Sequence, residues 1–215
     1  MGHYKKGILG GFSGKVGTVV GSSWKGIEYI RSRPAFKKSR TFSQPQLEQQ
    51  AKFSVAGKLV RSMSDLLNIT FKDATGMTGA NSAMRYNISN AVEGTYPGYT
   101  ISFPNVSVSR GALPLAEGAG AENATASMPG YINFIWNNNS GAGRAKASDR
   151  AVLVAYCESL QTAIYSTNAG TRSTGTASLQ VSLFSGKTVH TYLCFISDDG
   201  KVASDSVYTG VLLIP

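Results

Sequence analysis

The spacing of hydrophobic positions changes twice along the chain. In the first of the three stretches, residues 1–40, glycines interrupt the hydrophobic pattern. Six glycines between residues 7 and 21 disfavour a helix there. The runs Val16–Val20 and Ile27–Ile30 are β-prone and flank a candidate turn at Lys25-Gly26. The first forty residues therefore predict an arm with a two-stranded hairpin, which needs another surface because an isolated hairpin is barely stable.

A helical period follows the arm. Apolar residues recur every fourth position from Leu47 to Leu67, which predicts an amphipathic helix of about 22–25 residues. Ser43 is a natural N-cap, and Pro45 falls in the first turn, where proline is tolerated. After a break at 70–79, the segment Asn81–Glu93 predicts a second helix.

Beyond Tyr99 the period becomes two, as in strands with one buried face. Turn clusters rich in Gly, Asn, Asp and Pro separate nine candidate strands. These are 99–103, 106–110, 124–127, 131–137, 151–158, 161–167, 176–183, 189–197 and 205–213. The chain as a whole predicts an α+β fold, mainly β, with a basic Gly-rich arm at 1–42, a helical segment at 43–95 and an antiparallel β-sandwich at 96–215.

Charge divides the chain in a similar way. Residues 1–61 contain twelve basic and two acidic residues, a net +10, and the other 154 contain nine basic and ten acidic, a net −1. Together these give the overall +9. Such asymmetry favours an arm that contacts something acidic or inserts into a neighbouring subunit.

Two groups of arm residues are candidates for contact with partners. The subunit-interface candidates are the apolar and aromatic side chains of the arm: Phe12, Val16, Val19, Trp24, Ile27 and Tyr29. Trp24 is the expected anchor, either on the chain's own body or on a neighbouring subunit. The candidates for contact with phosphate or an acidic surface are the cations that follow: Arg31, Arg33, Lys37, Lys38 and Arg40. That stretch is also typical of a solvated connector or an address signal.

No residue pattern predicts catalysis, so we expect a protein that is not an enzyme, with no metal, cofactor or small-molecule substrate. Gly10–Lys15 fails as a phosphate-binding loop because Leu9 and Val16 stand where Gly and Ser/Thr are required. Asp198-Asp199 is the best acidic pair, and a hairpin turn explains it better than calcium binding. His190 lies within an apolar strand, which favours a buried, hydrogen-bonded side chain.

The cysteines Cys157 and Cys194 both fall in apolar strand patterns, which favours two buried thiols over a disulfide. No signal peptide is visible, since glycines and a lysine interrupt residues 7–20. No apolar run reaches the roughly 18 residues of a membrane span. We therefore expect a protein made for the cytoplasm, or for release from it by lysis.

From about Glu122 onward the chain resembles a fibronectin-III or immunoglobulin-like sandwich. Trp136 is similar to the inward tryptophan of the second strand of that fold, and Tyr192 to the residue that supplies a tyrosine-corner hydroxyl. The segments that carry the resemblance are 131–136, 150–156, 189–196 and 199–206. The resemblance implies an architecture and no activity.

The front end resembles a second family. Gly7–Ile27, followed by Tyr29 and Arg31–Pro34, is similar to the opening of a family of unknown function. That family occurs in one phylum of Gram-negative bacteria and in their phages, and the similarity extends over the whole chain. It implies a non-enzymatic, phage-linked protein and brings no catalytic residues.

Three functions follow from these observations. The leading one is a structural assembly protein, a virion or phage-like particle component whose arm docks on neighbouring subunits, so that its partners are copies of itself or other particle proteins. The first alternative is a nucleic-acid-associated protein, because basic residues of the arm are interleaved with aromatic ones. The second is a cell-surface adhesion module, since β-sandwiches are common in such modules.

Overall fold

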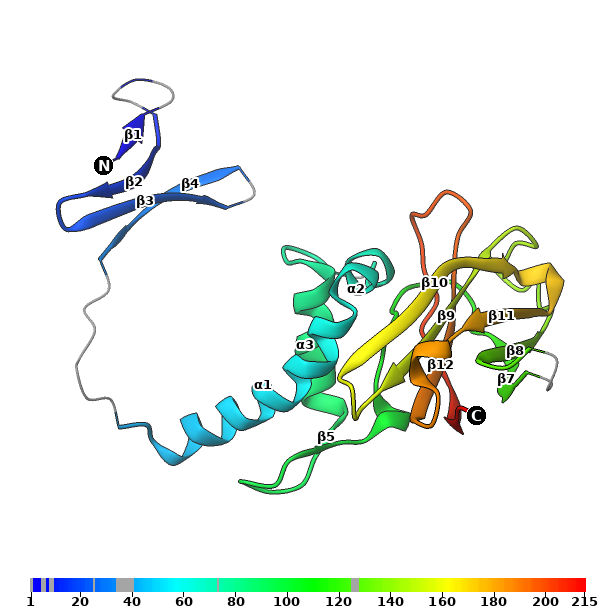
Figure 1. The fold of residues 1–215 in the computed structure, drawn as a ribbon. Helices are drawn as coiled ribbons and strands as arrows, with labels where there is room; N and C mark the ends of the chain where they lie inside the picture. Colours follow the sequence, from blue (N-terminus) through cyan, green and yellow to red (C-terminus); the bar gives the residue numbers. More distant parts are fainter. Residues whose placement is uncertain are drawn as a thin grey trace. The chain divides into compact units, whose positions relative to one another are not determined.

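The computed structural model describes residues 2–4, 7, 10–24, 26–33, 41–72, 74–124 and 128–215 (Figure 1). The chain divides into two compact units, the N-terminal unit (residues 1–43) and the body (residues 44–215). Each is described by itself. The fold is α+β and mainly β, as predicted, and its named strands pair antiparallel.

The N-terminal unit is a four-stranded sheet rather than the predicted two-stranded hairpin. Its strands, in the order β1-β2-β3-β4, are His3–Tyr4, Phe12–Val16, Val19–Trp24 and Ile27–Ser32. Val16 pairs with Val19 across a two-residue turn, so the predicted run at 16–20 is split. Gly17 begins that turn with a φ of 59°, which a side chain would disfavour. The second turn falls where it was predicted, between the paired residues Trp24 and Ile27.

Glycines allow close backbone contact within this unit. A β-carbon at Gly21 would lie 2.0 Å from the carbonyl oxygen of Phe12, so only glycine lets the start of β2 approach β3 there. The backbone N–H of Gly11 donates to Oε2 of Glu28 at 2.7 Å. The glycine-rich sequence therefore serves packing inside the unit.

Three helices open the body: α1 (Gln44–Ser62), α2 (Ser64–Thr70) and α3 (Gly79–Asn90). The predicted first helix is interrupted at Met63, whose φ of −137° is not helical. The second begins earlier than predicted because Thr78 caps it, accepting the N–H of Asn81 at 3.2 Å. After α3 the chain forms a short hairpin, β5 (Val92–Glu93) with β6 (Thr100–Ile101).

Two antiparallel sheets form a sandwich in the body. The first, in the order β10-β9-β12-β13, joins Thr162–Thr171, Arg150–Cys157, Thr188–Ile196 and Val207–Leu213. The second, in the order β11-β8-β7, joins Thr176–Gln180, Tyr131–Asn137 and Glu117–Asn123. Their facing sides share one core, which includes Phe134, Leu153 and Phe195. Trp136 points into this core, as predicted, and is 4% exposed.

Some predicted strands take other forms. Residues 103–105 form a 3-10 turn rather than part of a strand, and the segment after them, up to residue 110, has no named strand. The strand predicted at 124–127 lies mostly outside the described residues, and β7 precedes it. The proline at position 104 explains the first difference, since it fits the start of a turn and cannot donate to a ladder.

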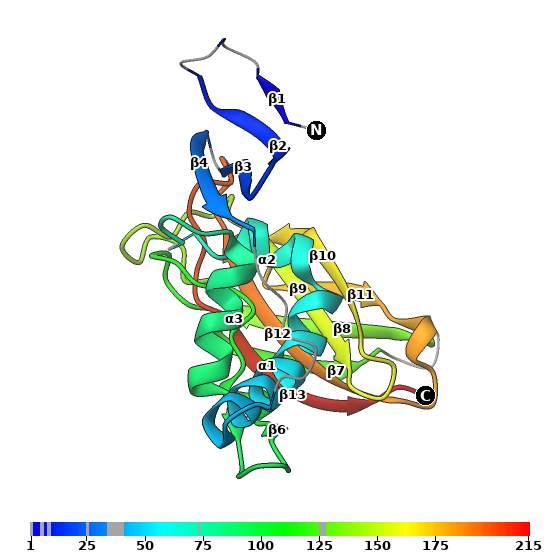
Figure 2. The ribbon, with the colours of Figure 1, turned by 90° about the vertical axis from the view of Figure 1, so that its left-hand side faces the viewer.

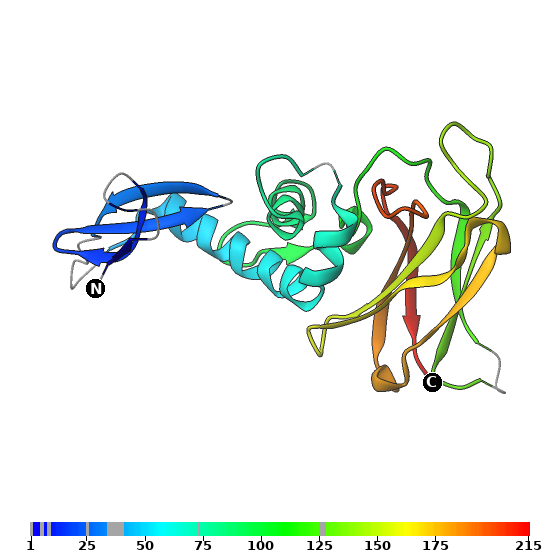
Figure 3. The same ribbon diagram turned by 90° about the horizontal axis from the view of Figure 1, so that it is seen from above.

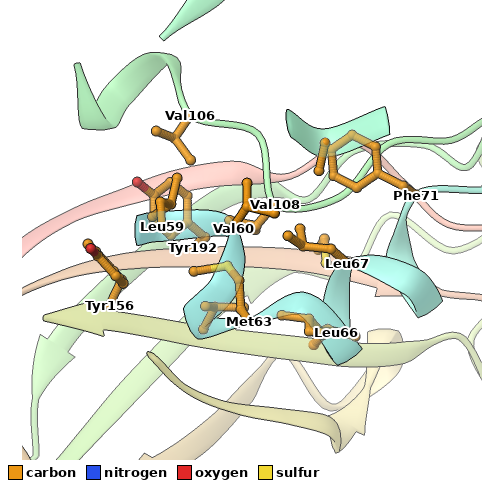
Figure 4. Close-up of a cluster of buried hydrophobic side chains, with 14 of the residues drawn as sticks. Leu59, Val60, Met63, Leu66, Leu67, Phe71, Val106, Val108, Tyr156 and Tyr192 are labelled. Carbon is orange, nitrogen blue, oxygen red and sulfur yellow. The ribbon is translucent and has the colours of Figure 1, made fainter. Parts of the chain in front are cut away.

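The outer face of the four-stranded sheet is covered as well. The three helices and residues 103–108 pack on it around a second core, which Figure 4 shows with Met63, Leu66 and Val108 at its centre. Figures 2 and 3 show the resulting layers of the body: helices, the four-stranded sheet and the three-stranded sheet. From Ala151 to Cys157 every residue of β9 is therefore buried.

The two cores also fix the surroundings of three side chains discussed from the sequence. The hydroxyl of Tyr192 donates to the carbonyl of Phe103 at 2.9 Å, far upstream, rather than to nearby backbone as in a tyrosine corner. Cys194 belongs to the core under the helices and Cys157 to the sandwich interior. Both thiols are buried and free, and the sheet separates them, so the disulfide alternative is excluded.

Candidate functional site

The register of the N-terminal sheet distributes the predicted interface residues over two faces. Directly paired residues project to the same side, and neighbours along a strand to opposite sides. One side, the aromatic face, carries Lys15, Val20, Ser22, Trp24, Ile27, Tyr29 and Arg31. The other, the glycine face, carries Phe12, Val16, Val19, Gly21 and Ile30. The six predicted side chains therefore do not form one surface.

The aromatic face is open. Trp24 is 51% exposed, Ile27 69% and Tyr29 42%. Lys15 and Arg31 are exposed beside them, so large apolar groups and cations share one side of a sheet. Exposed apolar patches that are contiguous often mark interaction sites.

The glycine face is enclosed only in part, since Ile30 on it is 62% exposed. Phe12 and Val19 are half-buried, and Phe12 lies directly over Gly21. Val16 is 44% exposed and lies close to Gly2. These residues contribute to the packing of the N-terminal unit itself.

The predicted anion-contacting cations are only partly placed. Arg31 lies in β4 on the aromatic face, opposite Val20. Arg33 is exposed, and its backbone N–H donates to the carbonyl of Thr18 at 2.8 Å. Lys37, Lys38 and Arg40 fall outside the described residues.

Two further residues discussed from the sequence have structural surroundings. Nδ1 of His190 lies 3.0 Å from the Tyr208 hydroxyl, and its ring stacks on Phe103 at 3.6 Å. Burial lowers the pKa of His190, so the ring is neutral at pH 7 and has aromatic partners. Asp199 accepts from the Ser197 hydroxyl at 2.7 Å and the Lys201 N–H at 3.1 Å, bonds that lower its pKa and define the hairpin turn that was predicted.

Sequence reasoning missed a buried ion pair. Nε of Arg172 donates to Oδ2 of Asp149 at 3.1 Å, and both side chains are fully buried. The other donors of the guanidinium reach the carbonyls of Pro114 and Leu115 and the side chain of Asn139. Cζ of Arg172 lies 3.8 Å from the centroid of the Phe195 ring. The arginine therefore ties three loops to one end of the sandwich.

The part of the chain that the structure describes has neither a metal site nor a membrane-spanning helix. It contains no group of three or more His, Cys, Asp or Glu side chains arranged to hold a metal ion. None of its helices is both long and apolar enough to cross a bilayer.

The fold defines a mainly β protein of two compact units, with an exposed aromatic face on the N-terminal unit. The chain belongs to a family of unknown function, DUF6266, whose model matches residues 11–210. The match covers the four-stranded N-terminal sheet from its second strand, the helices and nearly all of the sandwich. No curated protein and no solved structure matches the chain significantly.

Proposed function

We propose that the protein is a non-enzymatic structural component of a virion or phage-like particle, and that the N-terminal unit of one copy docks on the body of another. The observation that carries this proposal is the aromatic face, where Trp24, Ile27 and Tyr29 are exposed on a folded sheet. Burying such side chains is favourable, by roughly 1.5–3 kcal/mol for a large apolar group. The phage link depends on the family resemblance noted from the sequence.

The occupant that we propose is the edge of the sandwich in a second copy of this chain. β13 ends the four-stranded sheet and exposes Val211 (53%) and Leu213 (63%). Strand β7 lies beside it, since Nδ2 of Asn123 donates to the carbonyl of Leu213 at 2.8 Å. β7 also carries two exposed carboxylates, Glu117 and Glu122.

Val211 and Leu213 project outward from the four-stranded sheet, because Leu212 between them packs into the sandwich core. Glu122 projects outward from the three-stranded sheet, because its neighbour Ala121 packs into the same core. The β7–β13 strip (Glu117, Glu122, Val211 and Leu213) therefore has an apolar side, which would meet Trp24 and Ile27, and an acidic side, which carries charge opposite to that of the N-terminal unit. Residues 1–43 contain nine basic residues and one acidic, a net +8, whereas residues 44–215 contain twelve basic and eleven acidic, a net +1. Because every copy has both surfaces, head-to-tail docking extends into a ring or a larger assembly.

The oligomeric mass of the full-length protein tests this proposal. We expect the wild-type chain to form assemblies, and Trp24→Ser/Ile27→Ser and Val211→Ser/Leu213→Ser to lower the mass, as measured by analytical ultracentrifugation. Leu183→Ser is the matched control, since Leu183 is 68% exposed and lies outside both surfaces. A wild-type monomer, or assemblies unchanged in both double variants, would contradict the proposal.

A second candidate function is association with nucleic acid. It is favoured by the placement of Trp24 and Tyr29 on the same face as Lys15 and Arg31, because aromatic rings stack on bases while cations contact phosphates. Affinity for a single-stranded oligonucleotide should fall steeply with added salt and weaken in Trp24→Ser. Absence of binding at low salt would exclude this candidate.

A further inference from the structure

The body has a basic hollow that the charge count along the sequence does not reveal. Residues 110–113 lie between two other segments: Phe71 bridges to Arg110, and Leu113 bridges to Ser204. The N–H of Lys72 donates to the carbonyl of Arg110 at 3.0 Å. Backbone pairing thereby brings together parts of the chain that are far apart in sequence.

Four cations from four segments line this hollow, whose volume is about 370 Å³. They are Lys72, Arg110, Arg144 and Lys201. Among the described residues the lining contains one carboxylate, Asp205, so four positive charges against one negative give a net +3 there. A body that is close to neutral overall therefore concentrates positive charge at one place.

Gly111 in the lining allows close backbone contact with Ala203. A β-carbon at Gly111 would lie 2.2 Å from the carbonyl oxygen of Ala203, so any other residue would push the two segments apart. The N–H of Gly111 donates to Oδ1 of Asp205 at 3.0 Å. The acid in the lining is therefore used to hold the backbone in place.

One of the cations is held by a ring, and a second lies in an ordered loop. The guanidinium of Arg110 stacks over the ring of Tyr86 at 4.5 Å. Arg144 lies in a loop in which the N–H of Gly141 donates to the carbonyl of Ala145 at 2.9 Å, and Ala145 is buried. That loop leads to Asp149, which the buried Arg172 holds.

Among the described residues, three of these cations have only weak ion pairing or none. Nζ of Lys201 lies 3.6 Å from Oδ2 of Asp199, but both side chains are well exposed, and such pairs contribute little. Within the described ranges no carboxylate forms an ion pair with Lys72 or Arg144. Cations that converge in this way are a common means of binding an oxyanion.

We propose that this hollow binds a phosphate-class oxyanion. Lys72, Arg144 and Lys201 supply ammonium and guanidinium donors, and Arg110 also lines the hollow. A second hollow of about 290 Å³, lined by Arg85 and Tyr86, shares Arg110 with the first. The anion is either free phosphate or a phosphate of a nucleic-acid strand, which present the same oxygens. The proposal does not depend on docking of the N-terminal unit.

Titration of the full-length protein with inorganic phosphate tests the proposal. We expect saturable chemical-shift changes at the amides of Gly111, Ala112 and Val202, with a dissociation constant in or below the millimolar range. Arg144→Gln/Lys201→Gln should weaken binding roughly tenfold or more, because hydrogen bonds to charged groups are among the stronger ones. Lys58→Gln/Lys187→Gln removes the same charge elsewhere and should leave the affinity unchanged.

Equal weakening in both double variants would show that only net charge matters, and no effect of either would show that Arg144 and Lys201 do not hold the anion; both results would overturn the proposal. A short single-stranded oligonucleotide distinguishes the two sources of phosphate. If it shifts the same three amides at lower concentration than phosphate does, the ligand is a nucleic-acid strand. If it leaves them unchanged while phosphate shifts them, the ligand is the free ion. No shift at these amides with either probe overturns the proposal.

Discussion

Two antiparallel four-stranded sheets in this chain have opposite surroundings. In β9 of the body every residue from Ala151 to Cys157 is buried, because helices cover one face and a second sheet the other. In β4 of the N-terminal unit all six residues are exposed. The same type of sheet therefore contains a fully buried strand in the body and a fully exposed strand in the N-terminal unit.

The difference indicates how each unit is stabilised. Each large apolar side chain buried in the body contributes roughly 1.5–3 kcal/mol, and two cores supply many of them. The N-terminal sheet depends on backbone pairing and on close contacts such as Gly21 against Phe12. Small sheets with little burial are weakly stable, so this unit has the most to gain from a partner.

The largest effect is expected where the body buries charge. Arg172→Met leaves the carboxylate of Asp149 buried without its cation, and one oxygen of that carboxylate already lacks a partner within the described residues. The free energy of unfolding should fall by about 3–5 kcal/mol, as measured by urea denaturation. Lys187→Met, an exposed cation, is the control, and a loss of similar size there would refute the explanation.

The next effect tests whether the helices and the sandwich unfold as one body. Leu66 faces the core under the helices, and Leu153 faces the sandwich interior. Leu66→Ala and Leu153→Ala should each cost about 2–5 kcal/mol, because both leave cavities. Circular dichroism and tryptophan fluorescence should give coincident transitions for both variants. Two separate transitions would show that the layers are independent.

A smaller effect is expected from His190. Its pKa in the folded protein is lowered from 6.5 by burial, so the unfolded chain binds more protons as the pH falls below that value. The stability should therefore be constant above about pH 6.5 and fall below it, through the lower folded pKa. His190→Gln should flatten this part of the curve. An unchanged slope in His190→Gln would contradict this assignment.

The smallest effect is expected on the exposed sheet. Ile27→Ser should change the free energy of unfolding of the body by no more than about 0.5 kcal/mol, because Ile27 is 69% exposed and belongs to the other unit. Val20→Ser, also on the aromatic face but half-buried, is a useful comparison within that sheet. A large loss in the body after Ile27→Ser would mean that the two sheets are not energetically separate.

The sequence was sufficient to predict features that depend on local periodicity. The period of two from β8 onward predicted the sandwich, and the apolar surroundings of Trp136 and Cys194 predicted their burial. The helix break at Met63 was missed, because Met63 is apolar and fits the stripe that continues through Leu67. Periodicity reports which residues are buried and not where the backbone bends.

Features that depend on distant pairing were not predictable. Arg172 appears in the sequence as one more cation, and only the fold places it beside Asp149, 23 residues earlier. Gly17 looked like part of a strand, although it forms a turn that creates two strands. The hollow around Arg110 likewise depends on pairing of Arg110 with Phe71 and of Leu113 with Ser204, residues far apart in the sequence, for which a single sequence gives no signal.

The separation of Cys157 and Cys194 by the central sheet determines how the protein responds to oxidants and reductants. Burial raises the pKa of the Cys194 thiol to about 12, so almost none of it is ionised and ready to react. The folded body therefore contains no disulfide that a reductant could break, and its two thiols are shielded from oxidants. Its unfolding midpoint should be the same with and without dithiothreitol, a tolerance that suits a protein exposed to both reducing and oxidising surroundings.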